Sequence, residues 1–246
     1  MTLATRAVAT AVLAAAIAVL GFLGPLHLFI GALVLAVAFA VGWSALTDLP
    51  FPPGSAAVIA LTGGGAVGVV YHRSAVQSPD LRDVAIVFAG SVLLTFVNEL
   101  LRRDGRTRLV ESVAGTVTGS LMAACAAGWV ACGRSNQGLA LVVAGAVALA
   151  VASALSAVRM PRWLTTFVIS LGGAGGGALL GFVLPVLGPL AGVLAGLAVG
   201  MLVAAMQALF HPLAALRRKL PAFTAVVLPV VVTGMLVYVV GRVLLG

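Results

Sequence analysis

The chain has 246 residues, of which 62% are hydrophobic and only 8% are charged, and its formal net charge is +8. Soluble domains contain about 45–50% apolar and about 25% charged residues, so this composition excludes a water-soluble globular protein. It predicts an all-α, polytopic transmembrane helix bundle, because a helix needs about 20 apolar residues to cross a bilayer.

Nine candidate membrane spans follow one another along the chain. They cover residues 5–23, 27–46, 55–71, 84–101, 109–132, 139–157, 164–184, 189–210 and 222–245. Proline and glycine mark most of the breaks between them, as at Gly24-Pro25 and Pro161. The first and third spans are short, so a count of eight is the alternative. The loops leave no room for a folded aqueous domain, and residues 1–246 are expected to form one integral membrane domain.

Lysine and arginine are distributed unevenly between the two ends of these spans. With a cytoplasmic N-terminus, ten of them lie in cytoplasmic segments: Arg6, Arg102, Arg103, Arg106, Arg108, Arg159, Arg162, Arg217, Arg218 and Lys219. The outer segments then hold four, namely Arg73, Arg82, Arg134 and Arg242. This bias predicts an N-in, C-out topology. The abundance of Ala, Val, Gly, Leu and Arg is typical of GC-rich genes and favours a bacterial cytoplasmic membrane.

The positive charge suggests different partners here than it does in a soluble protein. A basic soluble chain suggests nucleic acid, but these basic residues adjoin apolar spans. We therefore expect no nucleic acid partner. Anionic lipid headgroups at the cytoplasmic face are the expected partners, in particular of Arg217, Arg218 and Lys219.

A weak internal repeat relates spans 2–5 to spans 6–9 as two parallel halves. Residues 58–65 (VIALTGGG) are similar to residues 168–175 (VISLGGAG), and one span later Arg102-Arg103 corresponds to Arg217-Arg218. Such halves are common in transporters. The alternative is chance similarity, which low-complexity apolar sequence produces readily.

Glycines recur four residues apart along the seventh and eighth spans, as in a glycine zipper. They are Gly173, Gly177 and Gly181 in one span, and Gly188, Gly192, Gly196 and Gly200 at the start of and within the next. Faces without side chains let helix backbones approach closely in a membrane. The pattern predicts tight helix packing, and the alternative reading is a smooth face along which helices move.

The most concentrated polar region joins the fourth span to the fifth. It contains Asn98, Glu99, Arg102, Arg103, Arg108 and Glu111. A carboxylate in apolar sequence is costly unless it is paired, so Arg102 or Arg103 is expected to pair with Glu99, and Arg108 with Glu111. One reading is a topology-setting loop with ion pairs at the helix ends. The other is a substrate-binding site for a phosphate or carboxylate, which guanidinium groups bind bidentately.

Residues 108–115 resemble, in charge and spacing, the Lys-Thr-x-Glu-Gly-x-x-Gly stretch of CDP-diacylglycerol synthases. That family carries a later acidic, metal-binding signature, whereas no Asp or Glu follows Glu111 here. We therefore assign no family, no metal site and no cofactor from the sequence. Cys125 and Cys132 are expected to be buried apolar side chains. Most other polar residues of the spans, including Ser153, Ser156 and Gln207, are expected to bond to their own helix.

These features favour a permease-like protein that moves a small solute or a lipid-linked molecule. The spans contain many glycines, and no catalytic motif is present, so catalysis is less expected than transport. A membrane enzyme that acts on a phosphate-bearing lipid is one alternative. A scaffold that holds a membrane protein partner, or a second copy of the chain, is the other.

Overall fold

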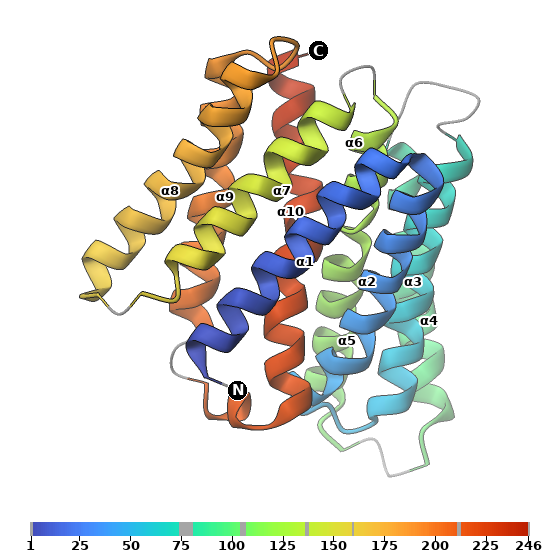
Figure 1. The fold of residues 1–246 in the computed structure, drawn as a ribbon. Coiled ribbons are helices and arrows are strands. Elements are labelled where there is room, and N and C mark those ends of the chain that lie inside the picture. Colours follow the sequence, from blue (N-terminus) through green and yellow to red (C-terminus); the bar gives the residue numbers. More distant parts are fainter. Residues whose placement is uncertain are drawn as a thin grey trace.

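The structure is a computed structural model, and it describes residues 2–73, 81–103, 107–135, 138–158, 160–210 and 213–245. The protein is 88% helical, and no strand occurs in these ranges. The elements shown in Figure 1 are α1 (Leu3–Leu23), α2 (Pro25–Leu46), α3 (Pro52–Arg73), α4 (Arg82–Leu101), α5 (Leu109–Ala124), α6 (Ala127–Gly133), α7 (Gly138–Leu155), α8 (Arg162–Val183), α9 (Pro189–Phe210), the 3-10 helix η1 (Ala214–Arg217) and α10 (Lys219–Leu245).

Nine stretches of helix among the described residues are long and apolar enough to cross a membrane. Their ends agree closely with the nine predicted spans, including the first and third, which are 21 and 22 residues long. The expected count of nine is therefore confirmed by length and composition, and the chain has the helices of a multi-pass membrane protein. The repeat and the orientation stay predictions.

The fifth span differs from the expectation of one continuous helix over residues 109–132. It is broken between α5 and α6, where the amides of Cys125 and Ala126 bond to carbonyls three residues earlier. Contacts with α10 explain the break. Gly128 is so close to the backbone of Gly234 that an added Cβ would collide with it, and Trp129 Nε1 donates to the carbonyl of Val230 at 2.8 Å.

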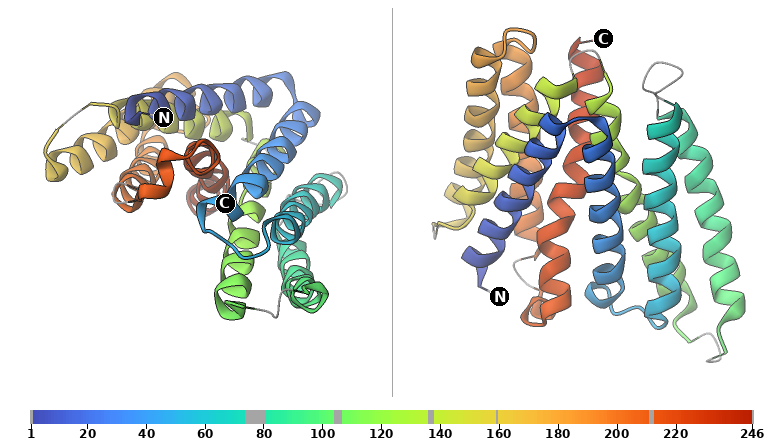
Figure 2. Two further views of the ribbon diagram at one scale, coloured as in Figure 1. Left: turned by 90° about the horizontal axis from the view of Figure 1, so that it is seen from below. Right: turned by 45° about the vertical axis from the view of Figure 1, so that its right-hand side comes forward.

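The two termini lie at opposite ends of the bundle, as an odd number of spans requires (Figures 1 and 2). We call the end that holds the N-terminus and the connection from α2 to α3 the N face, and the opposite end the C face. Helix α10 runs through the middle of the bundle and packs against α1, α2, α6, α7 and α9. Helix α4 lies at one edge against α3 and α5, and α8 at the other edge against α7 and α9.

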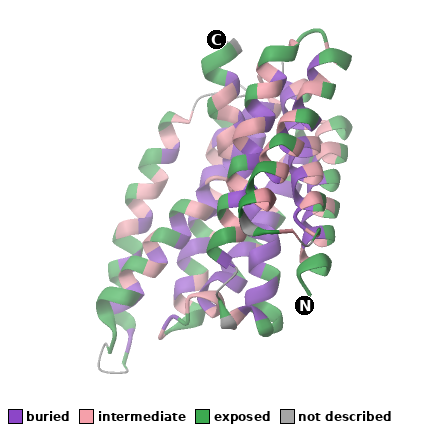
Figure 3. Cartoon of the chain, turned by 90° about the vertical axis from the view of Figure 1, so that its left-hand side faces the viewer, coloured by how far each residue is buried: buried purple, intermediate pink, exposed green. Residues whose placement is uncertain are grey.

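The outer surface of the bundle is apolar, as lipid contact requires. Large side chains such as Phe22, Phe182 and Val243 are about three-quarters exposed, at 74%, 74% and 76%. Buried residues line the inside of the bundle and exposed residues cover its outward faces (Figure 3). Many of the buried residues are alanine, glycine and valine, which lets the helices approach one another closely.

Helices α8 and α9 are in backbone contact along their glycines. A Cβ added to Gly181 would lie 2.6 Å from the carbonyl oxygen of Gly188, and one added to Gly200 would lie 2.8 Å from that of Ile169. Cβ atoms added to Gly173, Gly177, Gly192 and Gly196 would likewise meet the backbone of the other helix. Gly188 differs from these, because it has a positive φ of 73° in the turn before α9 and open space where a Cβ would be.

Candidate functional site

Helix α4 turns a polar face toward α3 and α5 and an apolar face outward. Its buried residues are Val84, Ser91, Thr95, Asn98 and Glu99, so all but the first are polar. In a membrane a polar group is stabilised when it faces the bundle interior rather than lipid. A hydroxyl of α5 contacts this face, since Ser112 Oγ donates to Glu99, and α5 is joined to α3 by the bond from Thr116 Oγ1 to Ser55 Oγ at 3.0 Å.

Glu99 is bound through both of its carboxylate oxygens. Arg102 Nη1 donates to Oε2 at 2.6 Å, and Ser112 Oγ donates to Oε1 at 2.5 Å. The side chains of Arg102 and Glu99 are 0% and 4% exposed, and Arg102 Nη2 also donates to the carbonyl of Thr107 at 3.1 Å. This is a buried ion pair with its hydrogen bonds made, which is the condition for such a pair to be tolerated.

Glu111 belongs to a separate, exposed cluster at the start of α5. Arg108 Nε donates to its Oε2 at 2.5 Å, and Arg108 Nη1 lies 3.6 Å from Asp48 Oδ2. The hydrogen bond to Glu111 raises the pKa of Arg108 above its ordinary value. Arg103 is exposed beside these groups. The six predicted site residues thus gather at the N face, but Glu99 and Glu111 have different arginine partners and very different exposure.

Asn98 is buried next to α3. A Cβ added to Gly54 would collide with Asn98 Oδ1, so the two residues are in close contact. The Nδ2 atom of Asn98 has no hydrogen-bond partner. A wide hollow of about 440 Å³ lies nearby and is lined by Phe51, Leu101, Arg102 and Arg103. Arg217, Arg218 and Lys219 lie on the same face of the bundle and are exposed around η1 and the start of α10.

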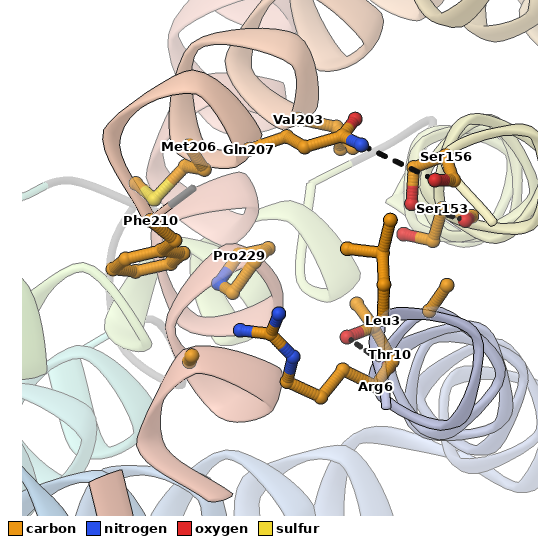
Figure 4. Close-up of a pocket in the computed structure, with 12 residues that line it drawn as sticks. Leu3, Arg6, Thr10, Ser153, Ser156, Val203, Met206, Gln207, Phe210 and Pro229 are labelled. Atoms are coloured by element: carbon orange, nitrogen blue, oxygen red, sulfur yellow. Dashed lines mark hydrogen bonds between the residues drawn. The ribbon is translucent and has the colours of Figure 1, made fainter. Parts of the chain in front are cut away.

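A second polar site, which we call the N-face pocket, lies between α1, α7, α9 and α10. It has a volume of about 250 Å³. Figure 4 shows Arg6 reaching from α1 toward α10, while Gln207 reaches from α9 toward α7. The lining residues are Leu3, Arg6, Ala7, Thr10, Ser153, Ser156, Val203, Met206, Gln207, Phe210, Ala225 and Pro229.

Unpartnered polar atoms are concentrated in this pocket. Arg6 Nε, Ser153 Oγ and Gln207 Oε1 are buried and have no hydrogen-bond partner, and in the described part of the chain only Asn98 Nδ2 shares this state. Buried polar groups are normally hydrogen-bonded, because an unsatisfied one costs about 1–3 kcal/mol. Three such atoms belong to residues that line one cavity, which indicates a place for a polar molecule or for water.

A proline lies within the continuous helix α10 where that helix borders the pocket. Pro229 has no N–H, so the carbonyl of Ala225 loses its helical hydrogen bond, and both residues line the cavity. One turn away, Thr10 Oγ1 lies 3.2 Å from the carbonyl of Val226 and bridges α1 to α10. A backbone acceptor therefore adds to the polar groups that the side chains supply.

Sequence reasoning did not single out this pocket. Ser156 bonds to its own helix as expected, since its Oγ donates to the carbonyl of Ser153 at 2.7 Å. Ser153 and Gln207 do not follow that expectation. The sequence predicts only a topology role for Arg6. Two features of the sequence do point to the pocket: Gln207 is a long polar side chain within an apolar span, and Pro229 lies within another.

Metal ligands do not converge in either site. In the ranges that the structure covers, no group of three His, Cys, Asp or Glu side chains is placed to hold an ion. Comparison of the chain with protein-family models, with curated proteins and with solved structures finds no match in any of the three.

Proposed function

We propose that this multi-pass membrane protein is permease-like, that it moves a small solute or a lipid-linked molecule, and that the molecule binds in the N-face pocket. The observation that carries the proposal is the set of three buried, unpartnered polar atoms on Arg6, Ser153 and Gln207 around one cavity. Four separate helices contribute the lining, so a change in their packing would change access to the pocket.

The proline within α10 supports the same proposal. Backbone groups without a helical partner can serve as ligands in transporters. Pro229 leaves one carbonyl of the otherwise continuous α10 without its helical hydrogen bond, and the helix lies at the centre of the bundle. An energy source is not part of the proposal.

A membrane enzyme acting on a phosphate-bearing lipid is the second candidate. The hollow beside Arg103 favours it, because Arg103 is exposed there and guanidinium groups bind phosphate. Glu99 is the buried carboxylate available there, but Arg102 and Ser112 occupy both of its oxygens. We therefore rank this function below transport.

Two-sided accessibility of the pocket tests the permease proposal without knowledge of the substrate. Ser153→Cys is labelled with a membrane-impermeant maleimide in vesicles that expose one face or the other, with the wild-type chain as background. We expect labelling from both faces, since a permease opens its site to each in turn. Ser120→Cys in α5 is the control, because Ser120 is equally buried but lies outside the pocket. Labelling from one face alone would contradict transport and would leave a binding protein or a scaffold as the function.

A further inference from the structure

We infer that the N-face pocket binds an oxyanion, a carboxylate or a phosphate, on a small amphipathic molecule, with Arg6 as its counter-charge. The inference names the ligand class of the pocket and rests on the proposed function. The overall positive charge of the protein does not single out Arg6, since the chain has thirteen other Lys and Arg residues.

The helices around the pocket bring a positive charge to it and no negative charge. Helices α1, α7, α9 and α10 contain no Asp or Glu, so the chain brings no carboxylate to Arg6 from any element that lines the cavity. The ion pairs formed by the described residues join Arg73, Arg102 and Arg108 to acids, and none of them includes Arg6. Arg6 is half-buried and its Nε has no partner, so an anion bound in the pocket would offset the solvation that this guanidinium has lost.

The remaining polar atoms constrain the rest of the ligand. Ser153 Oγ carries a hydrogen that it can donate to a second oxygen of the anion. Gln207 Nε2 donates to the carbonyl of Ser156 at 3.2 Å, which leaves Oε1 as an acceptor directed away from α7. An acceptor of this kind binds a hydroxyl or an N–H group of the ligand.

The size and walls of the pocket point to a small molecule with an apolar part. An apolar cavity of about 150 Å³ holds benzene, so a cavity of about 250 Å³ holds about ten non-hydrogen atoms. Leu3, Val203, Met206 and Phe210 supply the apolar wall. A free organic anion and the headgroup of an anionic lipid both offer this chemistry.

Binding to the purified, full-length protein in a neutral detergent tests the inference. Benzoate, phenyl phosphate and the short-chain lipid dioctanoyl phosphatidylglycerol are titrated separately by calorimetry, and benzyl alcohol serves as the uncharged probe. We expect at least one anionic probe to bind about tenfold or more tightly than benzyl alcohol. Arg6→Gln should weaken that binding by about 10- to 100-fold, the loss typical of a charged hydrogen-bonding partner.

The variants separate a binding role from a folding role. Arg6→Lys keeps the charge and should retain most of the affinity, and Arg242→Gln, which removes an exposed arginine at the C face, should bind as the wild type does. Binding of the lipid alone identifies a headgroup as the source of the oxyanion, and binding of benzoate or phenyl phosphate identifies a free solute. Equal binding of benzyl alcohol, or anion binding unaffected by Arg6→Gln, overturns the inference, as does the failure of all three anions.

The two experiments fail independently. If labelling at Ser153→Cys occurs from both faces while no anion binds, the pocket is a path for an uncharged molecule and the permease proposal stands. If an anion binds but the pocket opens to one face only, the oxyanion site stands and the permease proposal falls.

Discussion

The side-chain amide of Gln207 in α9 is oriented by the backbone at Ser156 in α7, because its Nε2 donates to that carbonyl at 3.2 Å. A carbonyl only accepts hydrogen bonds, so the NH₂ group must face it, and the side-chain oxygen is left buried without a partner. This bond links α7 and α9, two of the four helices around the cavity. It also leaves the side-chain oxygen of Gln207 as an atom that can accept a hydrogen bond from a ligand.

Replacing Gln207 with glutamate should weaken the binding of anions in the pocket. The new carboxylate would lie in the same cavity as Arg6 and supply the counter-charge that the chain otherwise lacks. We expect benzoate and phenyl phosphate to bind at least about tenfold more weakly. Gln207→Leu, which removes the acceptor without adding charge, should weaken binding by about two- to tenfold. Calorimetry compares the two variants, and wild-type affinity in Gln207→Glu would contradict the proposed position of the anion.

Breaking the Glu99–Arg102 pair should strongly destabilise the bundle. Glu99→Gln removes the carboxylate that pairs with the buried Arg102, and breaking a buried pair of this kind costs about 3–5 kcal/mol of unfolding free energy. Glu111→Gln is the matched control, because the Glu111–Arg108 pair is exposed to solvent and contributes little to stability. Denaturant unfolding in detergent micelles measures both. If the two substitutions cost the same, the Glu99 pair is not buried in the way described.

The glycine contacts between α8 and α9 predict a sharp difference between two substitutions. Gly196→Leu places a side chain against the backbone of Gly173, and overpacking of this kind costs about 1–3 kcal/mol or more. Gly175→Leu in α8 points into open space and should leave the melting temperature unchanged. A melting temperature that falls equally in both variants would indicate a general intolerance of glycine replacement rather than close packing.

The uneven distribution of Lys and Arg predicts that the N face is cytoplasmic and the C face is external. A reporter active only outside the membrane should therefore be active when it is fused after Gly246. The same reporter fused within the 47–51 connection should be inactive. Reversed activities would invert the orientation and place the N-face pocket toward the outside.

Most helix ends could be predicted because proline and glycine mark them in the sequence. Pro25, Pro52 and Pro189 begin helices in the structure, as residues with a preset φ and no N–H are suited to do. The break between Ala124 and Ala127 has no such mark. It depends on the contact of α6 with α10, and a contact between distant segments is not readable from local sequence.

The two candidate sites also differ in how far the sequence predicts them. Glu99 lies in the last turn of α4 and Arg102 is the residue that follows this helix, so the two are neighbours in the sequence and their pairing is local. Arg6, Ser153 and Gln207 lie on three helices far apart in the chain. These residues meet only if their helices are neighbours in the bundle. The spans are all apolar and similar in composition, so the periodicity of the sequence does not show which helices pack together.

The coupling of anion binding to helix movement tests the central claim most directly. Spin labels at Ala4→Cys in α1 and Leu209→Cys in α9, in a background with Cys125 and Cys132 replaced by alanine, mark two exposed positions beside the pocket. Pulsed electron paramagnetic resonance measures the distance between them. We predict two distance populations whose ratio shifts on addition of the anion that binds most tightly, and no shift when Arg6→Gln is also present. A single distance that the anion does not change would contradict a permease built around this pocket.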